Sequence, residues 1–271
     1  KPKIYGVPIS RSIGCIWACL ELGIDYELVP IGWDDDELSI YGEAYRAINP
    51  NARVPSLQDG DFVLWETLAI NTYLAKKQGG PLAPRDLRED ARVMQWALWS
   101  TIHLERGVFP WFLHSYILDE DKRDAAQAAK ALEDLQPLFR VLDGQLGKAP
   151  YLLGDRFTVA DLNLGCVLLR PRLQMNLDLG SHAHLKDWDA RVYARPAARQ
   201  ARGPDDRWIQ RPRQRNQQWR AETCLGRRLE PGSDRSRTAC MPRCWWRDPR
   251  YERPSPPHRR SAAAATHAEP R

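Results

Sequence analysis

Two serine hydroxyls lie in the loop between the first strand-like run and the first helical pattern of the chain. Ser10 and Ser12 flank Arg11 and follow residues 4–7. A helix N-terminus has free N–H groups and the positive end of the helix dipole, and a hydroxyl beside it can stabilise an anion by a charge-assisted hydrogen bond. Arg11 would add positive potential, although a solvated loop arginine has the same pattern. Both serines are candidate donors, and Ser12 could instead cap the helix.

A second group of polar residues lies where another strand-like run turns into a helix. Glu66 and Thr67 follow the run 62–65. The helix N-terminus suits a carboxylate, with the Thr67 hydroxyl as a further donor, and the Glu66 carboxylate could accept from an ammonium group. The alternative is simple capping, because acidic and hydroxyl residues are common in a first turn. Val54-Pro55, at the start of the preceding strand, is either an ordinary edge proline or a cis X-Pro bond.

The elements that position these residues form an α/β unit. Residues 4–29 have the order strand, helix, strand, which suggests two parallel strands joined by a helix. Gly23 closes the helix, and an Asp-Gly turn at 59–61 joins two short runs into a hairpin. The expected elements are a strand at 4–7, a helix at 13–22, a strand at 26–29, a weaker helix at 36–47, a hairpin at 54–64 and a helix from 68 to about 76.

The chain from Asp86 to about Arg199 is helical in pattern. Thr158 and Asp161 resemble a capping box with Asp in place of Glu, and this pattern indicates a structural role for Asp161. The expected helices cover 86–118, with a kink or an end near Phe109 caused by Pro110, then 122–146, then 158 to about 169, before Pro171. The predicted fold class is α/β plus all-α: an α/β domain at 1–78, a linker at 79–85, a helical domain at 86–202 and a tail at 203–271.

Aromatic residues and histidines in the first long helix carry weaker signals. Trp96, Trp99, His103 and Trp111 could line an apolar pocket, but aromatic residues at helical spacing more often form a core between helices. His103 and His114 have no third candidate ligand, so no metal site is predicted.

The cysteines and the hydropathy pattern favour a cytoplasmic protein. The six cysteines lack the spacing of a disulfide framework or a paired zinc site, and Cys15 and Cys19 are expected to be buried free thiols. No apolar run approaches the ~20 residues that a membrane-spanning helix needs, and no signal peptide is visible. A membrane partner is therefore not expected.

The charge divides the chain into two dissimilar parts. Residues 1–200 contain 23 Lys and Arg against 27 Asp and Glu, whereas residues 201–271 contain 17 Arg, no Lys and 8 Asp and Glu. No nucleic-acid partner is expected for the acidic body. The basic tail has three interpretations: disorder, a nucleic-acid-binding extension, or translation out of the original frame. Three aliphatic residues over 206–271 are too few for a packed core, so this segment is predicted to form no domain of its own.

Four motifs in order resemble the cytosolic glutathione S-transferase family, in its serine-type theta-, beta- or phi-like classes, over about residues 3–201. They are Tyr5-Gly6-Val7-Pro8-Ile9-Ser10-Arg11-Ser12, Asn49-Pro50-Asn51-Ala52-Arg53-Val54-Pro55-Ser56-Leu57, Trp65-Glu66-Thr67-Leu68-Ala69-Ile70 and Gly154-Asp155-Arg156-Phe157-Thr158-Val159-Ala160-Asp161. The resemblance implies a thioredoxin-like N-terminal domain, a helical C-terminal domain, glutathione as co-substrate, a small electrophilic substrate and usually a homodimer. The expected function is glutathione transfer; the alternative is a non-catalytic glutathione-binding or protein-interaction module.

The resemblance also implies how glutathione is held. Val54-Pro55 matches the family's cis-proline turn, and the Val54 backbone would pair with the cysteinyl part of glutathione as an added strand, with Arg53 beside it. Glu66 and Thr67 would bind the γ-glutamyl end.

The thiol would be activated by a serine hydroxyl. A free thiol has a pKa near ~8.5, so conjugation at neutral pH needs a donor that stabilises the thiolate. Ser10 matches the hydroxyl that follows the first strand in the serine-type classes, and Ser12 is the alternative. Gly14 departs from the family pattern, because many members have a basic residue near it on the first helix. This departure places the start of the helix and the activation of the thiolate in question.

Overall fold

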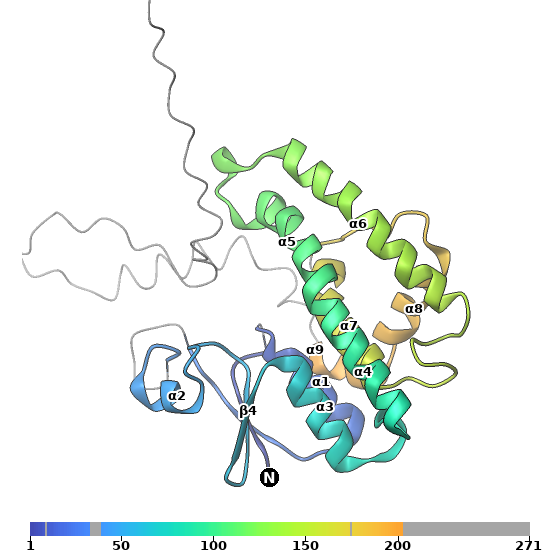
Figure 1. Ribbon diagram of the computed structural model, residues 1–271. Coiled ribbons are helices and arrows are strands. Elements are labelled where there is room, and N and C mark those ends of the chain that lie inside the picture. The colour runs from blue at the N-terminus through green and yellow to red at the C-terminus, as the bar shows by residue number, and fades with distance from the viewer. Residues whose placement is uncertain (9, 33–38, 174, 203–271) are drawn as a thin grey trace, which may run out of the picture. The chain divides into compact units, whose positions relative to one another are not determined.

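The computed structural model describes residues 1–8, 10–32, 39–173 and 175–202 of the 271-residue chain (Figure 1). The predictions for the tail, and those for the part of the 36–47 helix before residue 39, lie outside the described residues. Within them, the N-terminal part is a four-stranded sheet with helices, and the part from residue 87 onward is helical.

The sheet is mixed, with the strand order β2-β1-β3-β4. The strands are β1 (Lys3–Tyr5), β2 (Glu27–Val29), β3 (Ser56–Asp59) and β4 (Phe62–Trp65). The parallel pairing of β1 with β2 confirms the strand–helix–strand prediction, and the antiparallel pairing of β3 with β4 confirms the hairpin. Gly60 has φ +67° in the turn between these two strands, a conformation that favours glycine.

Side chains of the sheet alternate between its two faces, and both faces have apolar residues that helices cover. The helices are α1 (Ser12–Leu22), α2 (Glu43–Ile48) and α3 (Thr67–Gln78). Ile4 and Leu57 are fully buried in the large core that includes α1 and α3, whereas Tyr5 belongs to a separate cluster with Tyr45 of α2. The helix predicted at 36–47 is shorter than expected: α2 begins only at Glu43. This arrangement is the predicted thioredoxin-like domain.

The helical part begins after the short 3₁₀ turn Gly80–Leu82 and contains six α-helices in the described residues. They are α4 (Leu87–Trp99), α5 (Arg106–Phe112), α6 (Ala125–Leu146), α7 (Val159–Leu173), α8 (Ala183–Tyr193) and α9 (Pro196–Arg202). Two π-helical segments, Ser100–Glu105 and Leu113–Ile117, flank α5, and the 3₁₀ turn Glu120–Lys122 precedes α6. Figure 1 shows α5 and α6 side by side, in agreement with their extensive contact.

The helix ends expected next to two prolines are not found, whereas a kink at Pro110 stays a prediction. The helix does not end near Phe109: α5 continues through Pro110 to Phe112, and α7 continues through Pro171 to Leu173. Proline removes one backbone donor and its ring needs space in the preceding turn. The π-helical turns on both sides of α5 are wider than α-helical turns, which accommodates such a residue within a continuous helical stretch.

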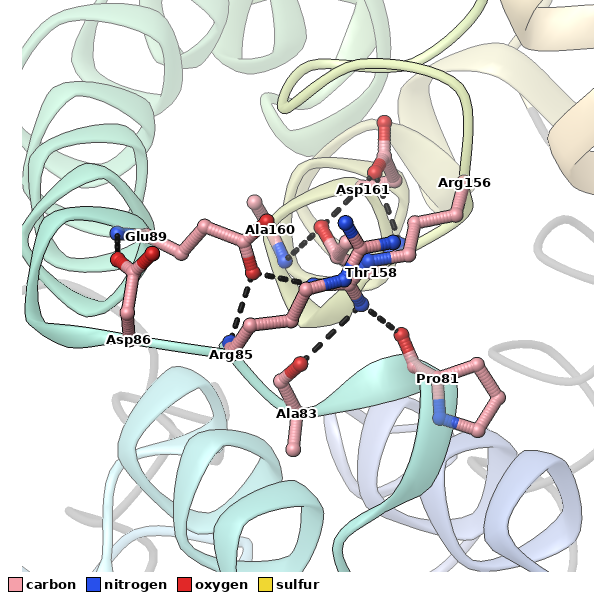
Figure 2. Close-up of polar contacts among 9 residues, drawn as sticks. All are labelled: Pro81, Ala83, Arg85, Asp86, Glu89, Arg156, Thr158, Ala160 and Asp161. Carbon is pink, nitrogen blue, oxygen red and sulfur yellow. Dashed lines mark hydrogen bonds and ion pairs between the residues drawn. The ribbon is translucent and has the colours of Figure 1, made fainter.

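The start of α7 is fixed by the predicted capping box. Thr158 N–H donates to Asp161 Oδ2 at 3.0 Å, and Ala160 N–H donates to Thr158 Oγ at 3.3 Å. Figure 2 shows this box beside Arg156, whose guanidinium donates to the carbonyl oxygens of Pro81 and Ala83. Arg156 also pairs with Glu89 of α4. The side chain of Arg156 thus joins the segment after α3 to the helical part.

Candidate functional site

The candidate residues converge at one end of the sheet because of the strand register. Ser56, the first residue of β3, pairs with Tyr5 at the end of β1 and with Trp65 at the end of β4. The residues that follow β1, precede β3 and follow β4 therefore leave the sheet at the same end. All the binding and catalytic residues predicted from the sequence belong to these three segments or to the start of α1.

The two serines form a hydrogen-bonded pair. Ser10 Oγ lies 2.8 Å from Ser12 Oγ and also accepts from Ser12 N–H at 3.2 Å. Ser10 Oγ donates to the Val7 carbonyl at 2.7 Å. Both side chains are buried. Because Ser12 is the first residue of α1, the capping contact considered for Ser12 is made by Ser10, whose hydroxyl satisfies an N–H group of the first turn.

Gly6 lies so close to the Ser12 hydroxyl that no side chain fits at position 6. Gly6 has φ +144°, and a side chain at this position would overlap Ser12 Oγ, lie 2.8 Å from Ser12 Cβ and lie 3.3 Å from Val54 Cβ. The end of β1, the first turn of α1 and the residue before the cis-proline are therefore in close contact. Gly6 was not singled out by the sequence, although a glycine directly after a strand is a signal of close approach.

The segment before β3 is fixed by side chains of α2 and its C-terminal end. The Val54-Pro55 peptide bond is cis, as predicted. The Arg53 carbonyl accepts from Tyr45 Oη at 2.5 Å and from Asn49 Nδ2 at 2.8 Å. The Arg53 side chain is exposed, and Val54 lies two residues before the first paired residue of β3. Val54 thus lies outside the paired residues of β3. The hydrogen bonds from Tyr45 and Asn49 to the Arg53 carbonyl fix the segment that contains it.

Glu66 and Thr67 form the predicted junction between β4 and α3. Glu66 is exposed and has φ +76° and ψ 116°, an unusual backbone conformation for a residue with a side chain. Thr67 is the first residue of α3 and is buried. Strained backbone of this kind costs about 1–3 kcal/mol and is concentrated at functional sites. The backbone conformation of Glu66 is thus a second reason, besides its place in the sequence, to keep Glu66 as a candidate.

Gly14, the departure from the family pattern, has a packing reason. It lies inside α1, so the glycine does not delay the start of the helix. A Cβ atom at this position would lie 2.8 Å from both Cys166 Sγ and Thr67 Cγ2, and 3.2 Å from Cys166 Cβ. The glycine thus permits a close approach of α1 to α3 and α7.

We expect Gly14→Ala to destabilise the protein although alanine is the better helix former. The gain in helix propensity, about 1 kcal/mol, is offset by overpacking that costs about 1–3 kcal/mol. Gly144→Ala in α6 is the matched control, because a Cβ there meets nothing within 4 Å. Urea unfolding of both variants checks this, with Gly144→Ala at least as stable as the wild type. A Gly14→Ala protein that is more stable than the wild type would contradict the packing argument.

An ion pair not foreseen from the sequence joins the serine loop to the helical part. The Arg11 guanidinium pairs with the Glu105 carboxylate through two hydrogen bonds, of which Nη1 to Oε2 is 3.3 Å. Arg11 lies between the two serines, and Glu105 is the last residue of the π-helical segment before α5. The partners are separated by 94 positions in the sequence, which explains why no local pattern pointed to Glu105.

A buried amide pair holds α3 against α7. Asn71 Nδ2 donates to Asn163 Oδ1 at 3.0 Å, and Asn163 Nδ2 donates to Thr72 Oγ at 3.3 Å and to the Leu68 carbonyl at 3.4 Å. Asn71 and Asn163 are almost fully buried. This pair fixes the helix whose first turn carries Thr67, and it too was missed because its members are far apart in sequence.

The aromatic residues of the first long helical stretch differ in burial. Trp96 and Trp111 are buried members of the main core, as the core interpretation predicted. Trp99 is half-buried and makes an edge-to-face contact with Trp96, at 5.4 Å between ring centroids, and a tilted contact with the exposed His103, at 6.1 Å. Of the three tryptophans, Trp99 is therefore the one that is partly exposed, and a pocket-lining role for it stays a prediction.

The structure describes three cysteines, of which Cys15 and Cys19 are buried and Cys166 is partly exposed. Cys15 and Cys19 are free thiols with no exposed surface. Burial raises the pKa of Cys15 well above its usual value and that of Cys19 to about 12. Burial also raises the pKa of Cys166 to about 12, against the opposing effects of Asn71 and Arg11.

We therefore expect iodoacetamide at pH 8 to leave Cys15 and Cys19 unmodified in the folded protein, because the thiolate is the reactive form. Peptide mass spectrometry after labelling checks this, with the urea-unfolded protein, in which both residues react, as the control. Stoichiometric labelling of Cys15 in the folded state would show that this thiol is reactive.

A metal-binding cluster and a membrane-spanning helix are both absent from the described residues. Among residues 1–8, 10–32, 39–173 and 175–202, no group of three or more His, Cys, Asp or Glu side chains is arranged to hold a metal ion. In the same part of the chain, no helix combines the length and the apolar character needed to cross a membrane.

Comparison with known families gives two matches that cover both parts of the fold. Residues 4–82 match the family described as "Glutathione S-transferase, N-terminal domain", and residues 104–196 match "Glutathione S-transferase, C-terminal domain". Among curated proteins, the chain is 31% identical to glutathione S-transferase 3 of Zea mays, over 72% of this chain and 90% of the relative. It is 29% identical to glutathione S-transferase GstB of Escherichia coli, over 66% of this chain and 86% of the relative.

Solved structures of glutathione S-transferases are also similar to this chain. A theta class glutathione S-transferase from Xanthomonas axonopodis pv. citri, with glutathione bound, has a TM-score of 0.67 and 32% identity, over 75% of this chain and 98% of that one. Glutathione S-transferase-I bound with lactoylglutathione has a TM-score of 0.64 and 30% identity, over 74% of this chain and 97% of that one.

Proposed function

The chain belongs to the glutathione S-transferase family, and from this membership we propose how its residues bind and activate glutathione. The protein is a glutathione transferase with glutathione as its co-substrate, as its homologues and structural neighbours support. One observation carries the assignment of the site: the segments after β1, before β3 and after β4 all leave the sheet at one end, where the start of α1 meets them. The electrophile is proposed to be a small molecule.

Glutathione lies across this end of the sheet. The main chain of Val54 pairs with the cysteinyl part as an added strand, and Arg53 and Pro55 flank this contact. The position of Val54 beyond the paired residues of β3 supports this role. The N-terminus of α3 and the Thr67 hydroxyl bind the γ-glutamyl carboxylate, because free N–H groups and the helix dipole favour an anion. The exposed carboxylate of Glu66 accepts from the γ-glutamyl ammonium group.

Ser10 donates its hydroxyl hydrogen to the sulfur and stabilises the thiolate. Ser10 lies in the loop ahead of α1, whereas Ser12 is enclosed between Gly6 and Ser10 inside the first turn. This difference in position supports Ser10 as the residue that faces the substrate. The thiol proton leaves to water, and the thiolate then attacks the electrophile.

Turnover with a chloronitroaromatic acceptor tests the proposed function. We expect chloride release and formation of the glutathione thioether, with rates that saturate in glutathione. The alternative, a glutathione-binding or interaction module without catalysis, predicts calorimetric binding of glutathione but no conjugation across several classes of electrophile. Binding without turnover would therefore overturn the transferase assignment in favour of the module.

We propose that the protein is a homodimer, with the second copy packed on an exposed apolar stripe. Met94, Leu98 and Ile102 are about half exposed and, at a spacing of four residues, lie on one face of the helical stretch that begins with α4. Exposed Phe62 and Trp65 lie on β4, the edge strand of the sheet. Exposed apolar side chains grouped in this way favour burial against a partner.

We expect Leu98→Asp to convert a dimer into single chains, because a carboxylate is costly in an apolar interface. Light scattering measures the mass of wild type and variant. Val141→Asp on α6 is the matched control, since Val141 has a similar exposure of 48% against 51% for Leu98. A wild type that has the mass of one chain, or a Leu98→Asp variant that stays dimeric, would contradict this interface.

The cellular location is proposed to be the cytoplasm. Cys15, Cys19 and Cys166 are free thiols in the described part of the chain. Reduced cysteines are typical of that compartment.

A further inference from the structure

The hydrogen bonds of the two serines have a fixed direction. A hydroxyl carries one hydrogen and two lone pairs. Ser10 uses its hydrogen to reach the Val7 carbonyl, at 2.7 Å, so the hydrogen in the 2.8 Å contact between the two hydroxyls belongs to Ser12. Ser10 Oγ therefore accepts two hydrogen bonds, one from the Ser12 hydroxyl and one from the Ser12 N–H.

We infer that Ser12 is a positioning residue, whose hydroxyl donates to Ser10 Oγ and directs the Ser10 hydrogen to the sulfur of glutathione. This inference rests on the proposed function, in which Ser10 is the donor to the thiolate. When the sulfur binds, the Ser10 hydrogen turns from the Val7 carbonyl to the sulfur, while both bonds from Ser12 remain in place. Since both lone pairs of Ser10 Oγ are occupied, its hydrogen is the only group left to face the substrate.

Hydrogen bonds in series strengthen one another. A hydroxyl that accepts hydrogen bonds is a better donor, and the effect is larger in a buried site than in water. Both serines are buried, with exposed fractions of 2% for Ser10 and 0% for Ser12. The pair can therefore stabilise the thiolate more strongly than Ser10 alone. The thiol proton is released to water, and neither serine is deprotonated.

Gly6 supports this role for Ser12. The Ser12 hydroxyl occupies the space in which a side chain of residue 6 would lie. It therefore lies against the residue that follows β1 and within hydrogen-bond distance of Ser10. The charged groups beside the pair, Arg11 and its partner Glu105, are not changed by a substitution of Ser12.

The test is a double-mutant cycle of Ser10→Ala and Ser12→Ala, read from the pH profile of kcat and from KM for glutathione. Ser12→Cys is a second variant that keeps the shape but has only a weak donor. Ser39→Ala is the matched control, because Ser39 is equally buried and accepts from the N–H groups of Tyr41 and Gly42, outside the site. The melting temperature of each variant shows whether it is folded. If Ser12→Ala does not fold, the comparison is made with Ser12→Cys.

We expect Ser12→Ala and Ser12→Cys to raise the kinetic pKa by about half a unit and to lower kcat at neutral pH about threefold. KM for glutathione stays unchanged, and kcat recovers at high pH. Because Ser12 acts through Ser10, the double variant should equal Ser10→Ala alone. Ser39→Ala should have the wild-type profile.

The other outcomes separate failure of the inference from failure of the proposed function. If Ser10→Ala shifts the profile and both Ser12 variants do not, Ser12 is merely structural and the inference is wrong. If the two effects add in the double variant, the serines act independently and the inference is also wrong. If Ser12→Ala shifts the profile and Ser10→Ala does not, Ser12 itself is the donor and the role proposed for Ser10 fails.

Discussion

Replacement of Ser10 by alanine is expected to lower kcat about tenfold or more at neutral pH, while the Kd for glutathione changes little. The variant removes the one donor assigned to the sulfur and leaves Val54, Glu66 and Thr67 in place. Loss of this hydrogen bond should raise the pKa of the bound thiol by about one unit, since one unit corresponds to about 1.4 kcal/mol. Stopped-flow or steady-state conjugation measures kcat, and calorimetry measures Kd.

The kcat and Kd of the Ser10→Ala variant together decide the role of Ser10. If glutathione affinity and kcat fall together, Ser10 also contributes to the binding of glutathione in the ground state. Its role would then not be limited to stabilising the thiolate. A wild-type rate in Ser10→Ala would exclude it as the activating hydroxyl. The Ser39→Ala control shows how much of any effect follows from loss of a buried hydroxyl as such.

Replacement of Asp161 by alanine is expected to give the largest loss of stability, about 3–5 kcal/mol. Asp161 is fully buried and its carboxylate accepts four hydrogen bonds. The donors are Leu152 N–H at 2.9 Å, Trp188 Nε1 at 3.0 Å, and the N–H and hydroxyl of Thr158 at 3.0 and 3.1 Å. Alanine leaves all four donors buried without this acceptor.

Replacement of Asp161 by asparagine distinguishes the effect of its hydrogen bonds on stability from the effect of its negative charge. Asp161→Asn keeps one oxygen, but its amide nitrogen would face donors, so a smaller loss of about 2–3 kcal/mol is expected. Urea unfolding measures both variants, with Asp134→Asn on the exposed face of α6 as the control, where a surface pair with Lys130 is worth about 0–1 kcal/mol. An Asp161→Ala protein of wild-type stability would show that the capping box is dispensable.

The stability should also depend on pH through Asp161. Burial raises the pKa of its carboxyl above the ordinary value, although its hydrogen bonds to Leu152, Trp188 and Thr158 act in the opposite direction. A carboxyl whose pKa is higher in the folded state favours folding most at low pH, and this contribution is lost as the pH rises from about 4 to the folded-state pKa. The deficit of Asp161→Asn should therefore be larger at pH 4 than at pH 7.

The fold could be predicted from local signals because its elements end at residues with a clear physical role. Gly23 ends α1 with φ +63°, and its N–H reaches the last turn of the helix. The Asp59-Gly60 turn sets the hairpin, and the box of Thr158 and Asp161 starts α7. Neither Pro110 nor Pro171 ends its helix. Wider turns beside Pro110, and the position of Pro171 near the end of α7, accommodate the proline ring.

The candidate site was visible as a set of residues but not as a set of contacts. The types and spacing of Ser10, Ser12, Glu66 and Thr67 indicated hydroxyl and carboxylate chemistry near helix N-termini. The sequence could not indicate that Ser12 donates to Ser10, since the direction depends on the Val7 carbonyl. The pairing of Arg11 with Glu105 depends on packing between segments far apart in the chain.

The most direct test of glutathione activation is a titration of the thiol in bound glutathione. Thiolate absorbance in the ultraviolet, recorded against pH with saturating protein and corrected with the S-methyl derivative, gives the pKa of the bound thiol. We predict a value at or below about 7.5, in the range that helix N-termini produce, against about 8.5 for a free thiol. A bound thiol that titrates with the pKa of free glutathione would contradict the proposed activation at this site.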